Sequence, residues 1–296
     1  MRELLKRTND LVFKAIFGSE SNKDILADFL LAVLKLPEEE FSHLEITNPF
    51  TTVDKANDKV GILDIKVFTK CKYVINVEMQ VEGSSDFRER VIYYMSKTVS
   101  AQMKRGDSYT LKQVVSIVIT DFKLIEENEE YHNVFELFDM RTGAKFSDLL
   151  QINTLEIPKL KEFEDSDIAD WLRFIKTQNA EELDYLSEKN EKISKAVETL
   201  TWLAMDEHMQ AAYDSREKAR WDETTRRKDA ENRGKAIGLA EGKIEGKIEG
   251  KIEGKLEEKV NTIRNSLNAN LDMPLIAQIA ELPVEEVEAI IREYEL

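Results

Sequence analysis

Two acidic residues interrupt two neighbouring apolar segments of the sequence. Asp64 lies in "GILDIKVFT" and Glu78 lies in "YVINVEMQV". Strands favour Val, Ile and aromatic residues at such positions, so acids there need an explanation. One or two carboxylates with retained waters are typical ligands of Mg²⁺. A metal ion held in this way can make a water nucleophilic and stabilise charge on a phosphate in transit. The two residue types therefore point to metal-assisted phosphate chemistry.

The spacing predicts that the two acids face each other. Residues 62–69 and 73–81 alternate between apolar and polar side chains, and a short polar turn around Cys71 joins them, which predicts a β-hairpin. If Cys71 is the centre of the turn, residues whose numbers sum to 142 lie opposite each other, as Asp64 and Glu78 do. Like charges in opposite positions destabilise a ladder, so the pair needs a compensating partner.

The alternation also predicts an amphipathic hairpin, because successive side chains of a strand point to opposite faces. The apolar face carries Leu63, Ile65, Val67, Ile75, Val77 and Met79, and the polar face carries Asp64, Lys66, Asn76, Glu78 and Gln80. The polar face could be open to water, its acids could pair with Lys66, or the register could differ. Alternatively, a divalent cation lies between the acids. Spacing alone leaves these interpretations open.

The elements around the hairpin predict the fold class. Apolar residues three and four apart predict helices within residues 9–35, broken near Gly18, and again within residues 86–105, ended by Gly106. Strands are expected in "HLEITNPFTTV", in "LKQVVSIVITDF", which is apolar enough to be buried on both faces, and in a hairpin turning at Thr142-Gly143 with a last strand after it. A strand–helix–strand order favours parallel neighbours. We therefore expect an α/β protein with a mixed sheet flanked by helices.

The strand signals stop near residue 164, so we expect one domain at residues 1–164 and a long helical region after it. Residues 165–233 are predicted to be helical, with Asp165 or Ser166 as the first cap. Glycine recurs every four residues through residues 234–259, which predicts either a weak helix that needs a partner helix or a flexible spacer.

Residues 260–296 predict two short helices around Leu282-Pro283. Their spacing resembles a helix-turn-helix, but the second helix, "VEEVEAIIREYEL", is mostly acidic, whereas a DNA-reading helix carries basic or amide side chains. Self-association through this C-terminal helical region is therefore the favoured interpretation.

Composition sets further bounds on the function. The 296 residues carry a net charge of −16, which disfavours non-specific nucleic-acid binding unless metal ions or local basic clusters offset the acids. The one cysteine excludes an internal disulfide, so a cytoplasmic location is expected. The sequence has no apolar run of membrane-spanning length, so no membrane partner is expected.

Four blocks together resemble a known family. They are Asp64 with "EMQ" at residues 78–80, "FRERVIYYMSKTVSAQMKRGDSY", "TNDLVFKAIFGSE" and the glycine-periodic tail. Taken together they resemble the recombination-promoting nuclease and transposase-like family of the PD-(D/E)XK superfamily. The resemblance implies a restriction-endonuclease-like fold and cleavage of DNA that depends on Mg²⁺, with Mn²⁺ as a substitute.

The resemblance also assigns roles to residues of the hairpin. It places Asp64 and Glu78 at the metal ligands and Gln80 where the general signature has lysine. Glutamine is neutral and can only form hydrogen bonds, so Gln80 would orient the water while Lys66, on the same predicted face, substitutes for the missing charge. Asp10 matches an additional acid of many such nucleases, although it could equally cap the first helix.

Four basic residues flank the helix after the hairpin: Arg88, Arg90, Lys104 and Arg105. They could contact DNA phosphates, or they could be ordinary surface residues. Two other functions remain compatible with the sequence. One is a weakly active or inactive nuclease fold that binds partners through its helical tail, and the other is a DNA-binding regulator that uses the last fifty residues.

Overall fold

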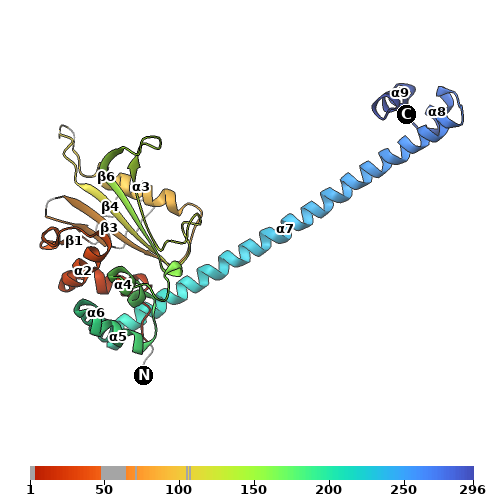
Figure 1. Cartoon of the computed structure of the whole chain (residues 1–296). Helices are drawn as coiled ribbons and strands as arrows, with labels where there is room; N and C mark the ends of the chain where they lie inside the picture. The colour runs from red at the N-terminus through yellow and green to blue at the C-terminus, as the bar shows by residue number, and fades with distance from the viewer. Residues whose placement is uncertain (1–3, 48–64, 71, 105, 107) are drawn as a thin grey trace. The chain divides into compact units, whose positions relative to one another are not determined.

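The computed structural model describes residues 4–47, 65–70, 72–104, 106 and 108–296. The chain divides into two compact units, Met1–Lys218 and Ala219–Leu296 (Figure 1). The first unit contains the sheet and the helices that cover it, so it holds the elements that position the candidate site.

The described strands of the first unit form one mixed sheet of six strands in the order β1-β2-β3-β4-β6-β5 (Figure 1). Their bounds are β1 Glu45–Thr47, β2 Ile65–Phe68, β3 Tyr73–Gln80, β4 Gln113–Thr120, β5 His132–Phe138 and β6 Lys145–Glu156. β4 is parallel to both β3 and β6, and the remaining pairs are antiparallel. The predicted α/β class with a mixed sheet is confirmed.

The crossover from β3 to β4 runs through helix α3 (Phe87–Ser100). β4 is buried along nearly its whole length, as its run of β-branched residues predicts. The helix ends earlier than predicted, because the N–H groups of Gln102 and Met103 turn back to carbonyls only three residues before them and close the last turn. Gly106, with φ of +98°, lies in the loop that follows.

The β2–β3 hairpin has the predicted register. Ile65 lies opposite Val77, and Lys66 lies opposite Asn76, so the paired numbers sum to 142. This register places even-numbered residues of β3 on one face of the sheet and odd-numbered residues on the other. Asp64 and the turn residue Cys71 lie outside the described residues.

Helices cover both faces of the sheet. On one face, α1 (Asp10–Phe17), α2 (Lys23–Leu34), α4 (Asp167–Lys176), α5 (Ala180–Lys189) and α6 (Glu191–Met205) share a core with the odd-numbered residues of β3. The rings of Phe17, Phe29, Trp171 and Phe174 pack in this core at centroid distances of 5.4 to 6.4 Å. On the other face, α3 packs over Val74, Val114 and Val118. The even-numbered face of β3 is therefore covered by a helix as well.

Local signals define several boundaries. Gly18 separates α1 from the next helix, since a Cβ there would lie 2.9 Å from the Lys14 carbonyl oxygen. Of the two predicted caps of α4, Ser166 is the one that accepts a hydrogen bond from the Ala169 N–H. Gly143, with φ of +70°, forms the predicted turn between β5 and β6. The expected last strand is not separate, because β6 continues from this hairpin without a break.

The glycine-periodic segment is helical. It lies within α7 (Glu207–Asn268), which begins in the first unit and ends in the second. The second unit adds α8 (Met273–Ala280) and α9 (Val284–Glu293), the two predicted short helices. Its small core is formed by Ile263, Ile276, Ala277, Ala280 and Val287. Within the described part of the chain, no helix combines the length and apolarity that crossing a bilayer requires.

The contact between α2 and α6 gives a prediction about stability. Asp24 accepts hydrogen bonds from Lys195 (2.6 Å) and Lys192 (3.2 Å). Desolvation opposes ionisation, but the two lysines outweigh it and hold the pKa of Asp24 below its usual 3.8. Because the folded pKa is depressed, this stabilisation is present above about pH 4 and is lost as the pH falls through the folded pKa. We expect Asp24→Asn to lower the free energy of unfolding at pH 7 by about 0.5–1 kcal/mol.

Urea titrations of both proteins at pH 7 and pH 2.5 measure the effect. The difference should shrink at the lower pH, and an equal difference at both would contradict the role of the Asp24 charge. Glu20→Gln, which removes an exposed pair with Lys23 within the same segment, is the matched control.

Candidate active site

Glu78 lies near the end of β3 on the face that α3 covers. Its side chain is only 9% exposed. Asn76, two residues earlier on the same face, is buried and donates to the Thr98 hydroxyl on α3 at 3.4 Å. The interpretation of a polar face open to water is therefore wrong for these two residues, because α3 excludes solvent from them. A carboxylate in this position needs compensation by charge and hydrogen bonds.

Arg90, in the first turn of α3, contacts the carboxylate directly. Its Nη2 lies 3.3 Å from Glu78 Oε1 and 3.2 Å from Gln80 Oε1. The side chains of residues 78 and 80 lie on the same face because they are two positions apart. One guanidinium nitrogen thus connects the two functional groups that the sequence singled out.

Gln80 is held by both ends of its amide. Its Oε1 accepts from Arg90, and its Nε2 donates to the Glu82 carbonyl oxygen at 3.1 Å. The second hydrogen of Nε2 and the second lone pair of Oε1 leave the amide able to hold a water. An amide has no charge and no acid–base role at neutral pH, so Gln80 can orient a molecule but cannot deprotonate it.

An aromatic side chain packs against the Arg90 guanidinium. The Arg90 guanidinium lies 4.8 Å from the centroid of Phe87, which is buried and packs edge-on against Phe122 at 5.9 Å. Phe122 in turn packs against Gly83, where an added Cβ would lie 3.2 Å from the ring. Glycine at position 83 therefore lets the chain pass closely under Phe122 on its way from β3 to α3.

Tyr94 follows Arg90 by one helical turn and therefore lies on the same side of α3. Desolvation raises the pKa of its hydroxyl, nearby Arg90 lowers it, and nearby Glu78 raises it. Burial is the largest of these effects, so the pKa of the hydroxyl is raised above its usual 10.

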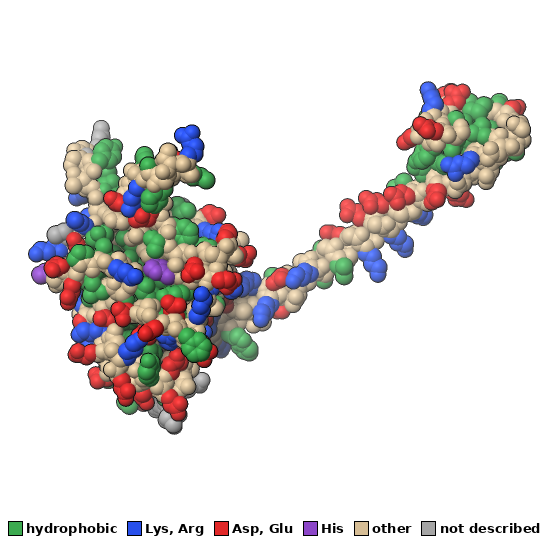
Figure 2. All heavy atoms as spheres, in the orientation of Figure 1, with side chains coloured by type: hydrophobic (Ala, Val, Ile, Leu, Met, Phe, Trp, Pro, Cys, Tyr) green, Lys and Arg blue, Asp and Glu red, His purple; other side chains and the backbone are tan. Residues whose placement is uncertain are grey.

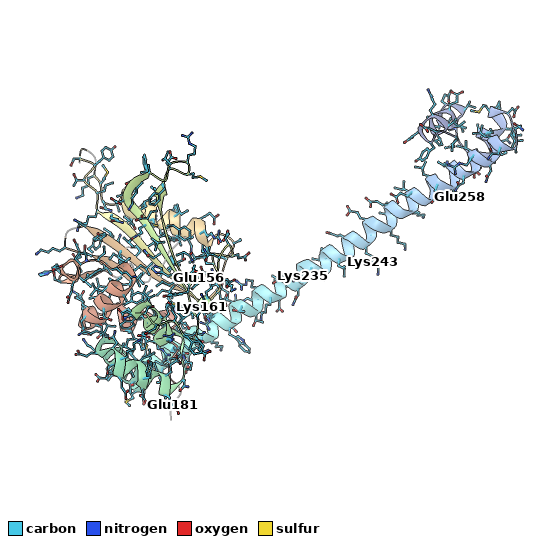
Figure 3. The ribbon with its side chains drawn as sticks, in the orientation of Figure 1. Glu156, Lys161, Glu181, Lys235, Lys243 and Glu258 are labelled. Carbon is cyan, nitrogen blue, oxygen red and sulfur yellow. The ribbon has the colours of Figure 1, made fainter. Side chains whose placement is uncertain are left out.

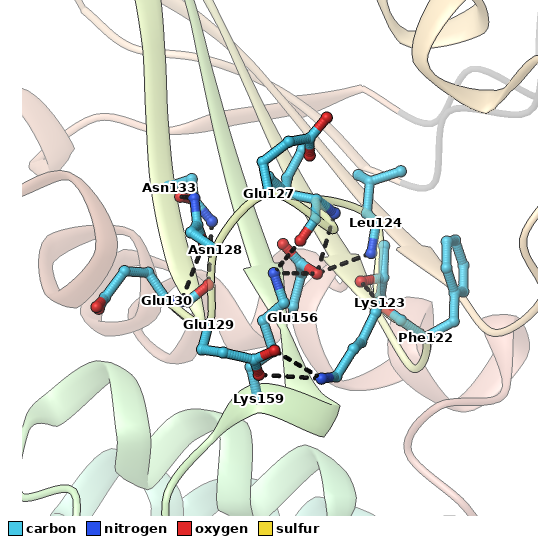
Figure 4. A network of polar contacts seen from close by, with 12 residues as sticks. Phe122, Lys123, Leu124, Glu127, Asn128, Glu129, Glu130, Asn133, Glu156 and Lys159 are labelled. Atoms are coloured by element: carbon cyan, nitrogen blue, oxygen red, sulfur yellow. Dashed lines mark hydrogen bonds and ion pairs between the residues drawn. The ribbon is translucent and has the colours of Figure 1, made fainter.

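A buried ion pair fixes the loop after β4 (Figure 4). Glu156 ends β6, and its Oε2 lies 2.9 Å from Lys159 Nζ with both side chains fully buried. The same oxygen accepts from the N–H groups of Leu124 (2.7 Å) and Ile125 (3.2 Å), and Lys159 donates to the Ile125 carbonyl oxygen. In the sheet register Gln80 pairs with Thr120, and Thr120 pairs with Glu156. The ion pair therefore anchors the strand ends beside the candidate site.

Two other predicted site residues have different surroundings. Lys66 is opposite Asn76 and half-buried, with its Nζ 5.3 Å from the Phe68 ring centroid, and desolvation lowers its pKa. Asp10 forms a two-pronged ion pair with Arg216, with Nη2 2.7 Å and Nε 3.1 Å from Oδ2. The cap of α1 is Asn9, whose side chain accepts from the Leu11 N–H, so Asp10 is not the capping residue.

The other basic residues with predicted roles differ in their exposure and contacts. Arg88 is half-exposed, donates to the Leu124 carbonyl oxygen and pairs with Glu127 at 3.6 Å. Lys104 is exposed in the loop after α3, and Arg105 lies outside the described residues. The structure thus joins Glu78, Gln80 and Arg90 in one cluster and does not describe Asp64 or Arg105.

The chemistry of the donor set suits a hard cation. Glu78 offers a carboxylate and Gln80 an amide oxygen, and oxygen ligands are those that Mg²⁺ prefers. Among the described residues, no group of three or more His, Cys, Asp or Glu could hold a metal ion.

The six-stranded mixed sheet flanked by helices is consistent with a nuclease-like α/β fold. The chain belongs to the PD-(D/E)XK nuclease family transposases, whose family model matches residues 7–230. The resemblance to that family is thereby confirmed for the three blocks within these residues, and the glycine-periodic tail lies beyond them. No curated protein and no solved structure matches the chain.

The contact of Arg90 with Glu78 and the Glu156–Lys159 pair were not predicted from the sequence. For each contact the sequence nevertheless contains a feature that could have predicted it. Only six residues separate β3 from α3, so the first turn of the helix must lie near the strand end. Glu156 and Lys159 are three residues apart, a spacing that allows an ion pair within one turn.

We expect Glu156→Gln to lower the free energy of unfolding by roughly 3–5 kcal/mol, because it leaves the Lys159 ammonium buried without a counter-charge. Urea denaturation followed by circular dichroism measures the change. Glu129→Gln, which removes an exposed partner of Lys123 in the same loop, should leave the unfolding midpoint unchanged. Equal midpoints for all three proteins would show that the buried pair does not anchor the loop.

Proposed function

We propose that the protein is a DNA endonuclease that hydrolyses phosphodiester bonds with Mg²⁺, or Mn²⁺ in its place, and serves recombination or a mobile element. Membership of a nuclease family supports this function. The observation that carries it is the buried Glu78 carboxylate beside the Gln80 amide at the end of a central strand. In open α/β sheets, ligands commonly bind at the carboxyl ends of the strands.

In this proposal Asp64 and Glu78 hold the metal ion, and Asp10 is an additional candidate ligand. When bound, the ion makes a water nucleophilic and neutralises charge on the scissile phosphate. Gln80 orients that water for in-line attack, and Lys66 is a candidate source of positive charge on the same face. The observed register of residues 65–68 is the one from which Asp64 was predicted to lie opposite Glu78.

Arg88, Lys104 and Arg105 are the candidate contacts to DNA phosphates, because positively charged side chains could neutralise the phosphate backbone. Acidic and basic side chains are interspersed over the visible face of the first unit (Figure 2). Contact with DNA would therefore depend on local cations and the metal ion rather than on a uniformly basic surface.

Nicking of supercoiled plasmid in the presence of Mg²⁺ tests the function. Asp64→Ala and Glu78→Gln should each reduce the rate by more than about 100-fold, since loss of a metal ligand exceeds the effect of losing its supporting contacts. Glu89→Gln removes an exposed acid of α3 and should retain wild-type activity. Equal activity of Asp64→Ala and wild type would reject the proposed site, and thermal melts show whether each variant is folded.

The second candidate is a nuclease fold with little or no activity that acts through partners. The observation that favours it is the neutral Gln80 at the lysine position of the signature. Calorimetric titration with Mg²⁺ separates the two functions, because the second one requires no metal binding at Glu78.

We also propose that the protein self-associates through its C-terminal helical region. Ile244, Ile248 and Ile252 on α7 are each more than half exposed, and an added Cβ would meet nothing within 4 Å at the glycines between them. Lys235 and Lys243 lie on the same helix (Figure 3), where Lys235 forms an ion pair with Glu231 one turn earlier at 2.6 Å. A stripe of small and apolar residues between charged ones suits close contact with a second helix.

Sedimentation velocity measures this assembly. Wild type should sediment as an oligomer, and Ile248→Lys with Ile252→Lys should shift it to the monomer, because two charges in the apolar stripe oppose helix contact. Lys243→Gln is the control and should leave the oligomer intact. A monomeric wild type at micromolar concentration would reject the assembly.

A further inference from the structure

The candidate site needs a positive charge that residue 80 does not provide. In the general signature a lysine occupies this position, whereas Gln80 is neutral at every pH. Glu78 is nearly buried beside it. A carboxylate excluded from water without a cation nearby is costly, so the fold must supply the charge from another element.

Arg90 is placed to supply this charge. A single nitrogen, Nη2, lies within 3.3 Å of Glu78 Oε1 and within 3.2 Å of Gln80 Oε1. A guanidinium remains protonated in proteins, so the charge is permanent. Because arginine has no acceptor and does not release its proton, it can align groups and stabilise negative charge but cannot act as a base.

The guanidinium is held in position by its neighbours. Two thirds of the Arg90 side chain is buried, since 34% is exposed. The Phe87 ring lies under the cation at 4.8 Å, and Phe122 braces that ring. Phe87 and Arg90 are three residues apart on α3, so both point toward the end of β3.

We propose that Arg90 is a positioning residue of the nuclease site: Arg90, rather than Lys66, takes over the electrostatic role of the missing lysine and aligns the Glu78 carboxylate with the Gln80 amide. This inference rests on the proposed nuclease function. Arg90 thus has a different proposed role from the three other basic residues, which are proposed to contact phosphates. Loss of Arg90 should therefore impair the chemical step more than the binding of DNA.

Three variants test the role: Arg90→Met, Arg90→Lys, and Arg90→Met combined with Gln80→Lys. Single-turnover cleavage of a saturating duplex with Mg²⁺ should slow by about 100-fold in Arg90→Met, the effect of removing one aligned charged donor. Gln80→Lys in the same protein should recover at least about tenfold, because it returns the charge to the strand. Arg90→Lys keeps the charge but shortens the side chain and removes the planar guanidinium that lies over Phe87, so its rate should be intermediate. Lys97→Met, which replaces an exposed cation of the same helix, should match wild type.

Two binding measurements distinguish this role from a phosphate contact and from structural damage. The affinity for the same duplex in Ca²⁺ should change by less than about threefold in Arg90→Met, whereas removing a residue that binds a phosphate would weaken binding and reduce its salt dependence. The Mn²⁺ affinity measured by electron paramagnetic resonance should be unchanged or higher, because Glu78 loses a competing cation. A misfolded site would instead bind Mn²⁺ more weakly.

Each possible result decides for or against the proposal. Wild-type cleavage by Arg90→Met, an equal loss of cleavage and duplex affinity, or no recovery with Gln80→Lys would overturn the role of Arg90 while leaving the nuclease function intact. If Arg90→Met does not fold, Arg90→Lys decides: full activity contradicts a role that depends on the guanidinium held against Phe87, and reduced activity with unchanged duplex affinity supports it. A wild type without metal-dependent cleavage rejects the proposed function itself and this role with it.

Discussion

The central constraint in the first unit is the burial of one carboxylate at the end of a central strand. Glu78 is excluded from water by α3, and the same helix brings Arg90 to its oxygen. The requirement for a charge partner ties the position of α3 to the strand end. Phe87, which supports the guanidinium, anchors that helix on the even-numbered face. Packing and electrostatics therefore specify the same arrangement.

A second buried group, the ion pair of Glu156 with Lys159, holds the strand ends next to Glu78 in place. The Glu156 carboxylate accepts hydrogen bonds from two backbone N–H groups and forms an ion pair with the Lys159 ammonium, and it thereby holds the loop that follows β4. Such a pair is a weak source of net stability but a strong penalty when broken, so it favours one loop conformation over its alternatives. Phe122 begins that loop and braces Phe87. Contacts between aromatic rings thus connect this loop, through Phe122 and Phe87, to the Arg90 side chain.

The sequence was informative where the signal was local or periodic. The alternation around Cys71 predicted the hairpin register, and the β-branched run predicted the buried parallel strand, because side-chain period and crossover geometry depend on few variables. The burial of the polar hairpin face was not predictable in this way. It depends on how α3 packs across the sheet, and an alternating strand has the same pattern whether its polar face meets water or a helix. The Arg90 contact follows from that packing and was equally hidden, so arginine at position 90 could be assigned only to the surface or to phosphates.

Charge decides how a chain of this composition could approach DNA. With 58 acidic and 42 basic residues, the long-range field repels a polyanion. Association with DNA would then depend on short-range contacts within a Debye length, where a few arginines and a bound metal ion would outweigh distant acids. The buried Glu78 does not add freely to the repulsion, because Arg90 lies against it and the two charges largely cancel at a distance. In the proposed nuclease function, the pairing that satisfies the buried carboxylate would therefore also lower the electrostatic repulsion between this site and a phosphate.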